Sequence, residues 1–223
     1  MWRLICIILC IGLLGIPVYA DAGEKYVALT FDDGPSGEYT CRLLEGLKER
    51  DVKATFLLCG YRIKEYPNTT KTIFEEGHEI GLHSYSHKNM GKMTQAQAAR
   101  EIADTLALLP DGCKPAFLRP PGGVCGEGVA AAAKDAGVAL LLWSVDPRDW
   151  ANHDAEAVET AVVDTVQDGD IILLHDMCDC SVDAALAIID KLQAQGFRFV
   201  TVSELAAIKN VTVKPGRTYR RFR

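Results

Sequence analysis

Short apolar segments alternate with longer amphipathic segments along most of this chain. Seven apolar runs have the length expected of strands, at 26–31, 52–58, 79–82, 116–118, 138–143, 170–174 and 197–201. Seven stretches between and after them have one apolar face at helical spacing, at 37–50, 61–77, 94–109, 125–136, 154–168, 181–195 and 203–209. This alternation predicts an α/β fold in which helices cover a parallel sheet, either as a barrel or as an open doubly wound sheet.

The first 20 residues do not belong to this alternation. Arg3 is followed by an apolar run that ends at Val18, and Val18-Tyr19-Ala20 has the small-residue pattern of a signal-peptide cleavage site. The run is shorter than the roughly 18 or more residues of a membrane span. We therefore expect residues 1–20 to be a cleaved signal peptide and the protein to be secreted or at the cell surface, with an uncleaved anchor as the alternative.

Charge changes the picture at the end of the chain. The whole chain has 24 Lys and Arg against 30 Asp and Glu, a net charge of −6, which argues against a nucleic-acid partner. Residues 211–223 contain only basic charges, at Lys214, Arg217, Arg220, Arg221 and Arg223. We expect residues 21–210 to form one domain and 211–223 to be a basic, frayed tail, with contact to an anionic cell-wall polymer as the alternative.

Five polar motifs each follow one of the apolar runs. They are Thr-Phe-Asp-Asp-Gly-Pro at 30–35, His-Ser-Tyr-Ser-His at 83–87, Arg-Pro-Pro-Gly-Gly at 119–123, Asp-Pro-Arg-Asp-Trp at 146–150 and Leu-Leu-His-Asp at 173–176. The carboxyl ends of parallel strands meet at one rim of a barrel or one edge of a sheet. The motifs are therefore predicted to form one site, at the C-terminal ends of strands one, three, four, five and six.

Several cysteines are also expected at this rim. Six of the eight lie beyond the signal segment, at positions 41, 59, 113, 125, 178 and 180, and an even number in an exported chain permits disulfides. Cys113 and Cys125 flank the fourth strand, so they should lie at opposite ends of the sheet and remain apart. Cys178 and Cys180 follow the last motif and are expected to pair with other cysteines on the rim.

The second motif contains two histidines suited to a metal. His83 and His87 are four residues apart, so on a helical turn both rings project from the same face. Asp33 adds an oxygen ligand and completes the three-ligand set of a catalytic zinc site, which keeps positions open for water and substrate. Two histidines and one carboxylate also form the facial triad of non-haem Fe(II) oxygenases. Taken singly, exposed histidines and Asp-Asp-Gly-Pro turns are common, so the metal prediction depends on their combination.

A base and an acid are also present, which favours hydrolysis over oxygen chemistry. Asp32 and Asp33 leave their strand in different directions, so Asp32 is free to take a proton from water activated by the metal. Arg119 pairs with Asp32 in this interpretation and keeps it ionised. Asp149 holds His175, raises its pKa and makes it a general acid. The alternative for Arg119 and Asp149 is an ordinary salt bridge at the rim.

In their order, the motifs from Thr30 to Asp176 resemble those of the polysaccharide deacetylases of carbohydrate esterase family 4. The resemblance implies a distorted (β/α)7 barrel of parallel strands and metal-dependent removal of N- or O-acetyl groups from a glycan. Peptidoglycan and chitin are the implied substrates and acetate is the product. Acetylated xylan as the substrate, or an inactive glycan-binding module, are the alternatives. Residues 21–210 are then the catalytic domain, which we expect to act as a monomer.

The same resemblance assigns roles to individual residues. It implies that Asp32 is the base and is oriented by Arg119. It implies likewise that His175 is the acid and is oriented by Asp149. A divalent metal, zinc with cobalt as the alternative, is bound in this assignment by Asp33, His83 and His87.

One position departs from the family pattern. Where the family commonly has an aromatic residue after Arg-Pro-Pro, this chain has Gly122. Its backbone N–H is still expected to bind the oxyanion of the reaction, but the side-chain wall of the sugar site is missing, which leaves the substrate preference open. Trp150 and Leu173 are expected to line the pocket for the acetyl methyl group, although single apolar residues beside a motif are more often part of the core.

Overall fold

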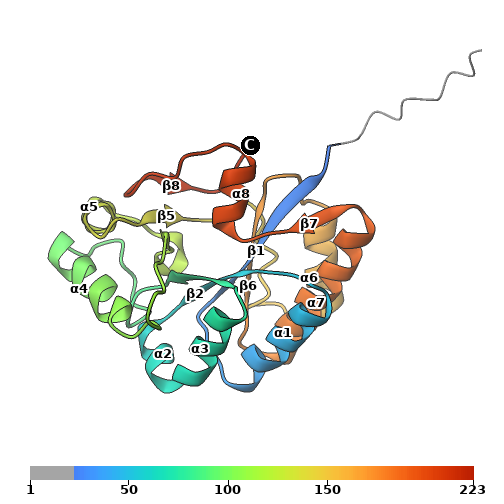
Figure 1. The fold of residues 1–223 in the computed structure, drawn as a ribbon, viewed down its shortest axis with the longest axis horizontal. Helices are drawn as coiled ribbons and strands as arrows, with labels where there is room; N and C mark the ends of the chain where they lie inside the picture. Colours follow the sequence, from blue (N-terminus) through green and yellow to red (C-terminus); the bar gives the residue numbers. More distant parts are fainter. Residues whose placement is uncertain (1–22) are drawn as a thin grey trace, which may run out of the picture.

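A curved parallel sheet lies at the centre of the computed structural model, which describes residues 23–223 (Figure 1). Its strands are β1 (Lys25–Asp32), β2 (Thr55–Leu58), β3 (Glu79–Leu82), β4 (Phe117–Leu118), β5 (Ala139–Leu141), β6 (Ile171–His175), β7 (Phe197–Phe199) and β8 (Thr218–Tyr219). The strand order is β6-β1-β2-β3-β4-β5-β8, and β7 pairs with the first residues of β1. All of these pairings are parallel. Strands β1 to β7 correspond to the apolar runs, which confirms the parallel α/β fold predicted from the sequence.

Helices surround this sheet (Figure 1). They are α1 (Glu38–Glu49), α2 (Gly60–Glu65), α3 (Pro67–Glu75), α4 (Gln95–Leu106), α5 (Glu127–Asp135), α6 (Ala155–Val163), α7 (Asp179–Ala194) and α8 (Val202–Ile208), and a short 3-10 helix at Pro121–Gly123 follows β4. The single helix predicted at 61–77 is two helices. Tyr66 leaves helical geometry, and Pro67, which lacks an N–H, begins the second helix.

Strand residues alternate between a side facing the helices and a side facing the interior of the curved sheet. On β1, Leu29 and Phe31 pack into the core beneath the helices, whereas Ala28 belongs to a second apolar cluster on the interior side. Helix α8 covers that cluster with Val202 and Leu205, at the end where the strands begin. Both sides of the sheet are therefore apolar over most of their length, as expected for a parallel sheet buried on both faces. Polar side chains gather at the opposite end.

The sheet closes only in part, in keeping with the distorted barrel expected from the sequence. Beyond β5 the chain crosses to β6, where Ser144 and Val145 donate their N–H groups to the carbonyl of Ile171 at 3.0 and 3.2 Å. Strand β8 continues the sheet on the edge of β5, with the carbonyl of Tyr219 accepting the N–H of Leu142 at 2.8 Å. The C-terminal segment thus fills part of the opening between β5 and β6.

Residues 211–223 differ from the frayed tail expected from their charge. Strand β8 pairs with β5, and Phe222 is only 1% exposed because it packs into the interior cluster beside α8. The carboxylate of Asp170 lies 3.8 Å from a guanidinium nitrogen of Arg221 and 3.4 Å from one of Arg223. A buried aromatic ring and these ion pairs hold the segment on the barrel, so the folded part of the chain extends beyond residue 210.

The six cysteines of the described part are all unpaired, so the disulfides expected for Cys178 and Cys180 are not observed. Both thiols lie beside polar neighbours instead of a second sulfur. Cys178 Sγ lies 3.4 Å from the hydroxyl of Ser181, and Cys180 Sγ lies 3.6 Å from the carbonyl of Asn152.

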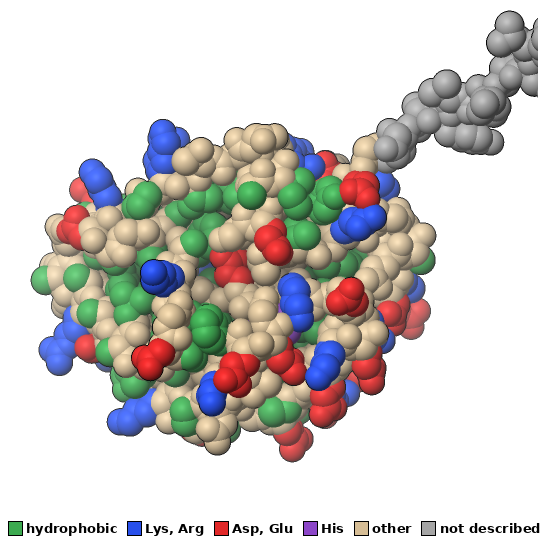
Figure 2. Space-filling model, viewed as in Figure 1, with side chains coloured by type: hydrophobic (Ala, Val, Ile, Leu, Met, Phe, Trp, Pro, Cys, Tyr) green, Lys and Arg blue, Asp and Glu red, His purple; other side chains and the backbone are tan. Residues whose placement is uncertain are grey.

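The signal peptide expected at 1–20 lies outside the described residues. Between residues 23 and 223, none of the helices has the length and apolar character needed to cross a membrane. On the face shown in Figure 2, acidic and basic side chains are interspersed, with apolar side chains between them. This face therefore carries no extended surface of a single charge.

Candidate active site

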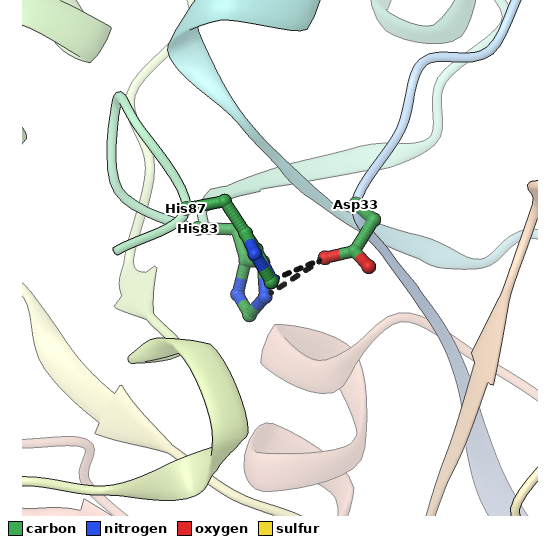
Figure 3. A group of neighbouring side chains, drawn as sticks. All are labelled: Asp33, His83 and His87. Atoms are coloured by element: carbon green, nitrogen blue, oxygen red, sulfur yellow. Dashed lines mark ion pairs between the residues drawn. The ribbon is translucent and has the colours of Figure 1, made fainter. Parts of the chain in front are cut away.

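Asp33, His83 and His87 direct three ligand atoms toward one point (Figure 3). The Nε2 atoms of His83 and His87 lie 3.2 and 2.9 Å from Oδ1 of Asp33, which is buried and accepts no hydrogen bond. Ligand atoms held at about 2.0–2.1 Å from a tetrahedral zinc ion lie about 3.3 Å from one another. The convergence of these atoms, and a donor set of two imidazoles and one carboxylate, therefore fit a catalytic zinc ion.

The two histidines are not on the helical turn expected from their spacing. Residues 83–87 form a loop in which Ser84 and His87 have left-handed backbone conformations, with φ of 62° and 54°. The hydroxyl of Ser84 accepts the N–H of His87 at 2.9 Å. Glu101 of α4 accepts three further hydrogen bonds, each of 2.8 Å, from the N–H groups of Tyr85 and Ser86 and from the hydroxyl of Ser86. These hydrogen bonds, rather than helical periodicity, bring the second histidine to the first.

His83 has a fixed ring orientation, because its Nδ1 lies 2.7 Å from the backbone carbonyl of Arg119. A carbonyl oxygen can only accept a hydrogen bond, so Nδ1 donates to it, and Nε2 is the ring nitrogen that faces Asp33 and is available to a metal. The backbone that follows β4 thus orients an imidazole ring that follows β3.

Asp32 forms a buried ion pair with Arg119. One guanidinium nitrogen of Arg119 donates to Oδ1 of Asp32 at 2.6 Å and to the hydroxyl of Thr30 at 2.9 Å. The other donates to the carbonyl of Leu142 at 3.2 Å. Arg119 is 0% exposed and Asp32 is 3% exposed, so removing either partner would leave an uncompensated buried charge. The second oxygen of Asp32 lies beside the metal cluster, 3.8 Å from Nε2 of His83.

Asp149 holds His175 through both carboxylate oxygens. Oδ1 lies 2.8 Å from Nδ1 of the ring, and Oδ2 accepts the backbone N–H of His175 at 2.8 Å. Burial lowers the pKa of His175, but the hydrogen bond and charge of Asp149, with the charges of Asp32 and Asp33, outweigh burial and raise the pKa from 6.5 to about 9. The imidazole therefore carries a proton at neutral pH.

A cavity of about 420 Å³ opens onto these groups. Gly122, Trp150 and Leu173 line it together with Asp32, His175 and the three-ligand cluster, whereas Arg119 and Asp149 lie behind Asp32 and His175. Trp150 is 57% exposed at its mouth, and Leu173 is 4% exposed at its wall. A side chain built at Gly122 would meet nothing within 4 Å, so the missing wall at this position is open space.

Two further residues line the cavity, Trp143 and Asp146, although no functional role was expected for either. The Trp143 ring lies 5.6 Å from the Arg119 guanidinium, and its Nε1 donates to Oδ2 of Asp146 at 3.2 Å. The only sequence signal for Trp143 is an aromatic residue at the carboxyl end of the fifth apolar run, which equally describes a core residue.

Residues 19–141 match the family described as polysaccharide deacetylase. A peptidoglycan-N-acetylglucosamine deacetylase of Bacillus cereus is 41% identical to the chain over 193 residues, which cover 84% of this chain and 91% of that protein. The chain belongs to the polysaccharide deacetylase family. Membership decides between the two classes of enzyme that a two-histidine, one-carboxylate cluster allows, in favour of the hydrolase over the Fe(II) oxygenase.

Solved structures of similar enzymes have the same fold as this polysaccharide deacetylase. A structure described as T48 deacetylase with substrate is 39% identical, has a TM-score of 0.82 and covers 88% of this chain and 96% of its own. A family 4 acetyl xylan esterase from Clostridium thermocellum, in complex with a cobalt ion, is 35% identical, also has a TM-score of 0.82 and covers 88% of this chain and 98% of its own. Both confirm the barrel fold predicted from the motifs.

Proposed function

We propose that this polysaccharide deacetylase uses zinc to remove acetyl groups from N-acetylated amino sugars of a cell-wall polysaccharide outside the cytoplasm. The observation that carries the proposal is the three-ligand cluster, which lies in one cavity with a carboxylate paired to a buried arginine and a histidine paired to a buried carboxylate. The name of the Bacillus cereus relative makes N-acetylglucosamine of peptidoglycan the first substrate to test. The export pattern at 1–20 supports action at the cell surface or beyond it.

Asp33, His83 and His87 hold the metal in this proposal, with cobalt as the alternative to zinc. A divalent ion bound there supplies a Lewis acid that activates water and polarises the acetyl carbonyl. The cobalt ion in the Clostridium thermocellum esterase supports a divalent metal in this fold. The hydrogen bond from His83 Nδ1 to the Arg119 carbonyl keeps the ligand tautomer ready for it.

Asp32 is the general base and takes a proton from the attacking water. Arg119 occupies Oδ1 of Asp32, so the oxygen near the cluster is the one available for the proton. Arg119 also balances the negative charge of this carboxylate in a site that water scarcely reaches.

His175 is the general acid. Its Nδ1 is bound by Asp149, so Nε2 is the nitrogen that delivers a proton to the departing sugar nitrogen as the C–N bond breaks, leaving acetate and a free amine. An amine is a poor leaving group without that proton, whereas an alkoxide released from an ester depends on it less. A histidine protonated at neutral pH supplies the proton that an amine leaving group needs, so N-acetylated sugars are the proposed substrate, with acetylated xylan as the alternative.

The acetyl group lies in the cavity beside Gly122, Trp150 and Leu173. The N–H of Gly122 donates to the acetyl oxygen as negative charge develops on it. Trp150 and Leu173, which are apolar residues of the cavity lining, contact the methyl group.

Acetate release tests the proposal directly. The purified enzyme should release acetate from peptidoglycan or N-acetylated chitooligosaccharide, lose the activity to a chelator, and regain it with zinc. Release from acetylated xylan alone would contradict the N-acetyl preference. Activity that survives complete chelation would contradict the metal.

Two variants separate the metal from the base. His87→Ala should abolish activity and lose bound zinc while the protein stays folded, because only two ligands remain. Asp32→Asn should keep the zinc and lower kcat by about 10²-fold or more, because the proton acceptor is gone. His153→Ala, at an exposed histidine outside the cluster, is the control for zinc content. Normal turnover in Asp32→Asn would show that another group is the base.

A further inference from the structure

The residue after the acid, Asp176, has a carboxyl group that the reaction does not use. Asp176 is 0% exposed, does not line the active-site cavity, and has one buried carboxyl oxygen without a hydrogen-bond partner among the described residues. Burial raises its pKa to about 6. A buried carboxyl group whose hydrogen bonds are not all satisfied is uncommon and destabilising in itself, so its presence calls for a structural reason.

The side chain of Asp176 reaches from the end of β6 to the segment that joins β1 to α1. One carboxyl oxygen accepts a hydrogen bond from the hydroxyl of Thr40, and the backbone carbonyl of Asp176 accepts one from the hydroxyl of Ser36. The hydroxyl of Thr40 in turn accepts the N–H of Ser36 at 2.8 Å. The segment that follows the metal-ligating Asp33 is therefore tied to the strand that carries His175.

The same carboxyl group packs directly against Gly34. A Cβ atom at Gly34 would lie 2.5 Å from Oδ1 of Asp176 and 3.0 Å from its Cγ, so no other residue fits there without a shift. The carbonyl of Gly34 accepts the N–H of Cys59 at 3.1 Å. Contacts from β6 and from the start of α2 thus fix the position of the residue next to Asp33.

Asp33 itself has a left-handed backbone conformation, with φ of 72°. A residue other than glycine keeps such a conformation only where its surroundings hold it. This conformation turns the carboxylate of Asp33 toward His83 and His87, at the distances that a shared metal requires. Without support beneath Gly34, the turn is free to relax and to withdraw the ligand.

We propose that Asp176 is a positioning residue for the metal site: its buried carboxyl group supports the Asp33–Gly34 turn and fixes Asp33 in relation to both histidines and to His175. The inference rests on the metal site proposed above. Asp176 touches neither substrate nor metal, so its effect is transmitted through Gly34 and Thr40.

Zinc affinity, measured by competition with a chromophoric chelator, tests this role without recourse to activity. Asp176→Ala should weaken zinc binding by about 10-fold or more, as expected when a group that orients a metal ligand is removed. Thr40→Val removes the same hydrogen bond from the other side and should weaken zinc binding in the same direction. Asp176→Asn keeps the shape and an accepting oxygen, so it should restore most of the affinity even if the melting temperature falls.

Activity supplies the second readout. Asp176→Ala loaded with saturating zinc should have a lower kcat with little change in KM, since the cavity wall is untouched. Asp179→Ala, three residues along and exposed on α7, is the matched control and should behave as wild type.

The inference is overturned if folded Asp176→Ala binds zinc as tightly as wild type, or if Asp176→Asn is as defective as the alanine variant. If Asp176→Ala does not fold, Thr40→Val decides, and wild-type zinc affinity in that variant overturns the inference. Failure of the wild-type protein to bind zinc would instead refute the proposed metal site itself.

Discussion

Both carboxylate oxygens of Asp149 contact His175. One lies 2.8 Å from Nδ1 of the ring, and the other accepts the backbone N–H. The ring is thereby held at a fixed angle, and the pKa of His175 is raised to about 9. The residue that we propose as the general acid is therefore protonated at neutral pH. The dependence of kcat on pH should therefore reflect the pairing of Asp149 with His175.

Asp149→Asn should move the alkaline limb of the kcat profile to lower pH. The amide keeps a hydrogen-bond acceptor but loses the negative charge that opposes the effect of burial, so the pKa of His175 falls. In wild type the limb should lie near pH 9, and in the variant activity should already decline closer to neutrality. A profile of kcat against pH for both enzymes measures the shift.

The same pair makes stability depend on pH. The folded-state pKa of His175 lies above its ordinary value of 6.5, so its contribution to stability is complete below about pH 6.5 and is lost as the pH rises through about 9. The melting temperature of wild type should therefore fall over this window more than that of Asp149→Asn. Asp164→Asn, at an exposed carboxylate, should match wild type in both measurements. An unmoved alkaline limb in Asp149→Asn would assign it to a different acid.

At the scale of elements, helix α4 fixes the loop that carries His87. Glu101 receives three hydrogen bonds from Tyr85 and Ser86, and these hold a loop with two left-handed residues. Glu101→Ala should lower zinc affinity by about 10-fold, because the second histidine is then free to move. Chelator competition measures the affinity, and amide hydrogen exchange at Tyr85 and Ser86 should quicken in parallel.

Asp104→Ala, one turn further along α4 at a half-exposed carboxylate, is the control for Glu101. It should change neither the zinc affinity nor the exchange of the loop. If Glu101→Ala keeps normal zinc affinity while the loop exchanges faster, the loop is not what holds His87 in the cluster.

At the scale of elements, some features of the site could be predicted from the sequence and others could not. The strand ends that carry Asp33 and His83 were predictable, because apolar runs in an alternating pattern place their carboxyl ends on one rim. The conformation of 83–87 was not, since a four-residue spacing fits a helical turn as well as a loop. The decisive partner, Glu101, lies on the next helix along the chain and was not flagged by the short-range pattern of the motif.

At the scale of the whole molecule, the C-terminal segment fills part of the opening between β5 and β6, and its Phe222 packs beside α8 at the end where the strands begin. Phe222→Ala should lower the free energy of unfolding by about 3–5 kcal/mol, the usual cost of deleting a buried aromatic ring. Urea denaturation measures the loss, and kcat per folded molecule should be unchanged because the cavity lies elsewhere. Arg220→Ala, at an exposed side chain of the same segment, should leave the stability unaltered. A large loss of kcat in folded Phe222→Ala would show that the two ends of the barrel are coupled.

The family motifs predicted the fold and most of the residues that line the cavity, but the charge of the C-terminal segment concealed its role. Two aromatic residues, Tyr219 and Phe222, stand among five basic ones between 211 and 223, and the basic residues dominated the expectation of a solvated tail. The pairing of β8 with β5 contradicts the expectation of a solvated tail. This pairing is possible because the chain beyond β5 turns to β6 and leaves one edge of β5 open. An open edge exists only in the assembled sheet, so it could not be predicted from either segment alone.

Gly169 brings the two ends of the described chain together. Its N–H donates to the carbonyl of Tyr26 at 2.7 Å and its carbonyl accepts the N–H of Phe222 at 2.9 Å, and Figure 1 shows the C-terminus on the same side as the beginning of β1. The arrangement of the elements in space should therefore survive a change in their order along the chain. A circular permutant that joins Arg223 to Gly23 through a short glycine linker, with new ends opened at the exposed turn at Asp111 and Gly112, should fold and keep its deacetylase activity.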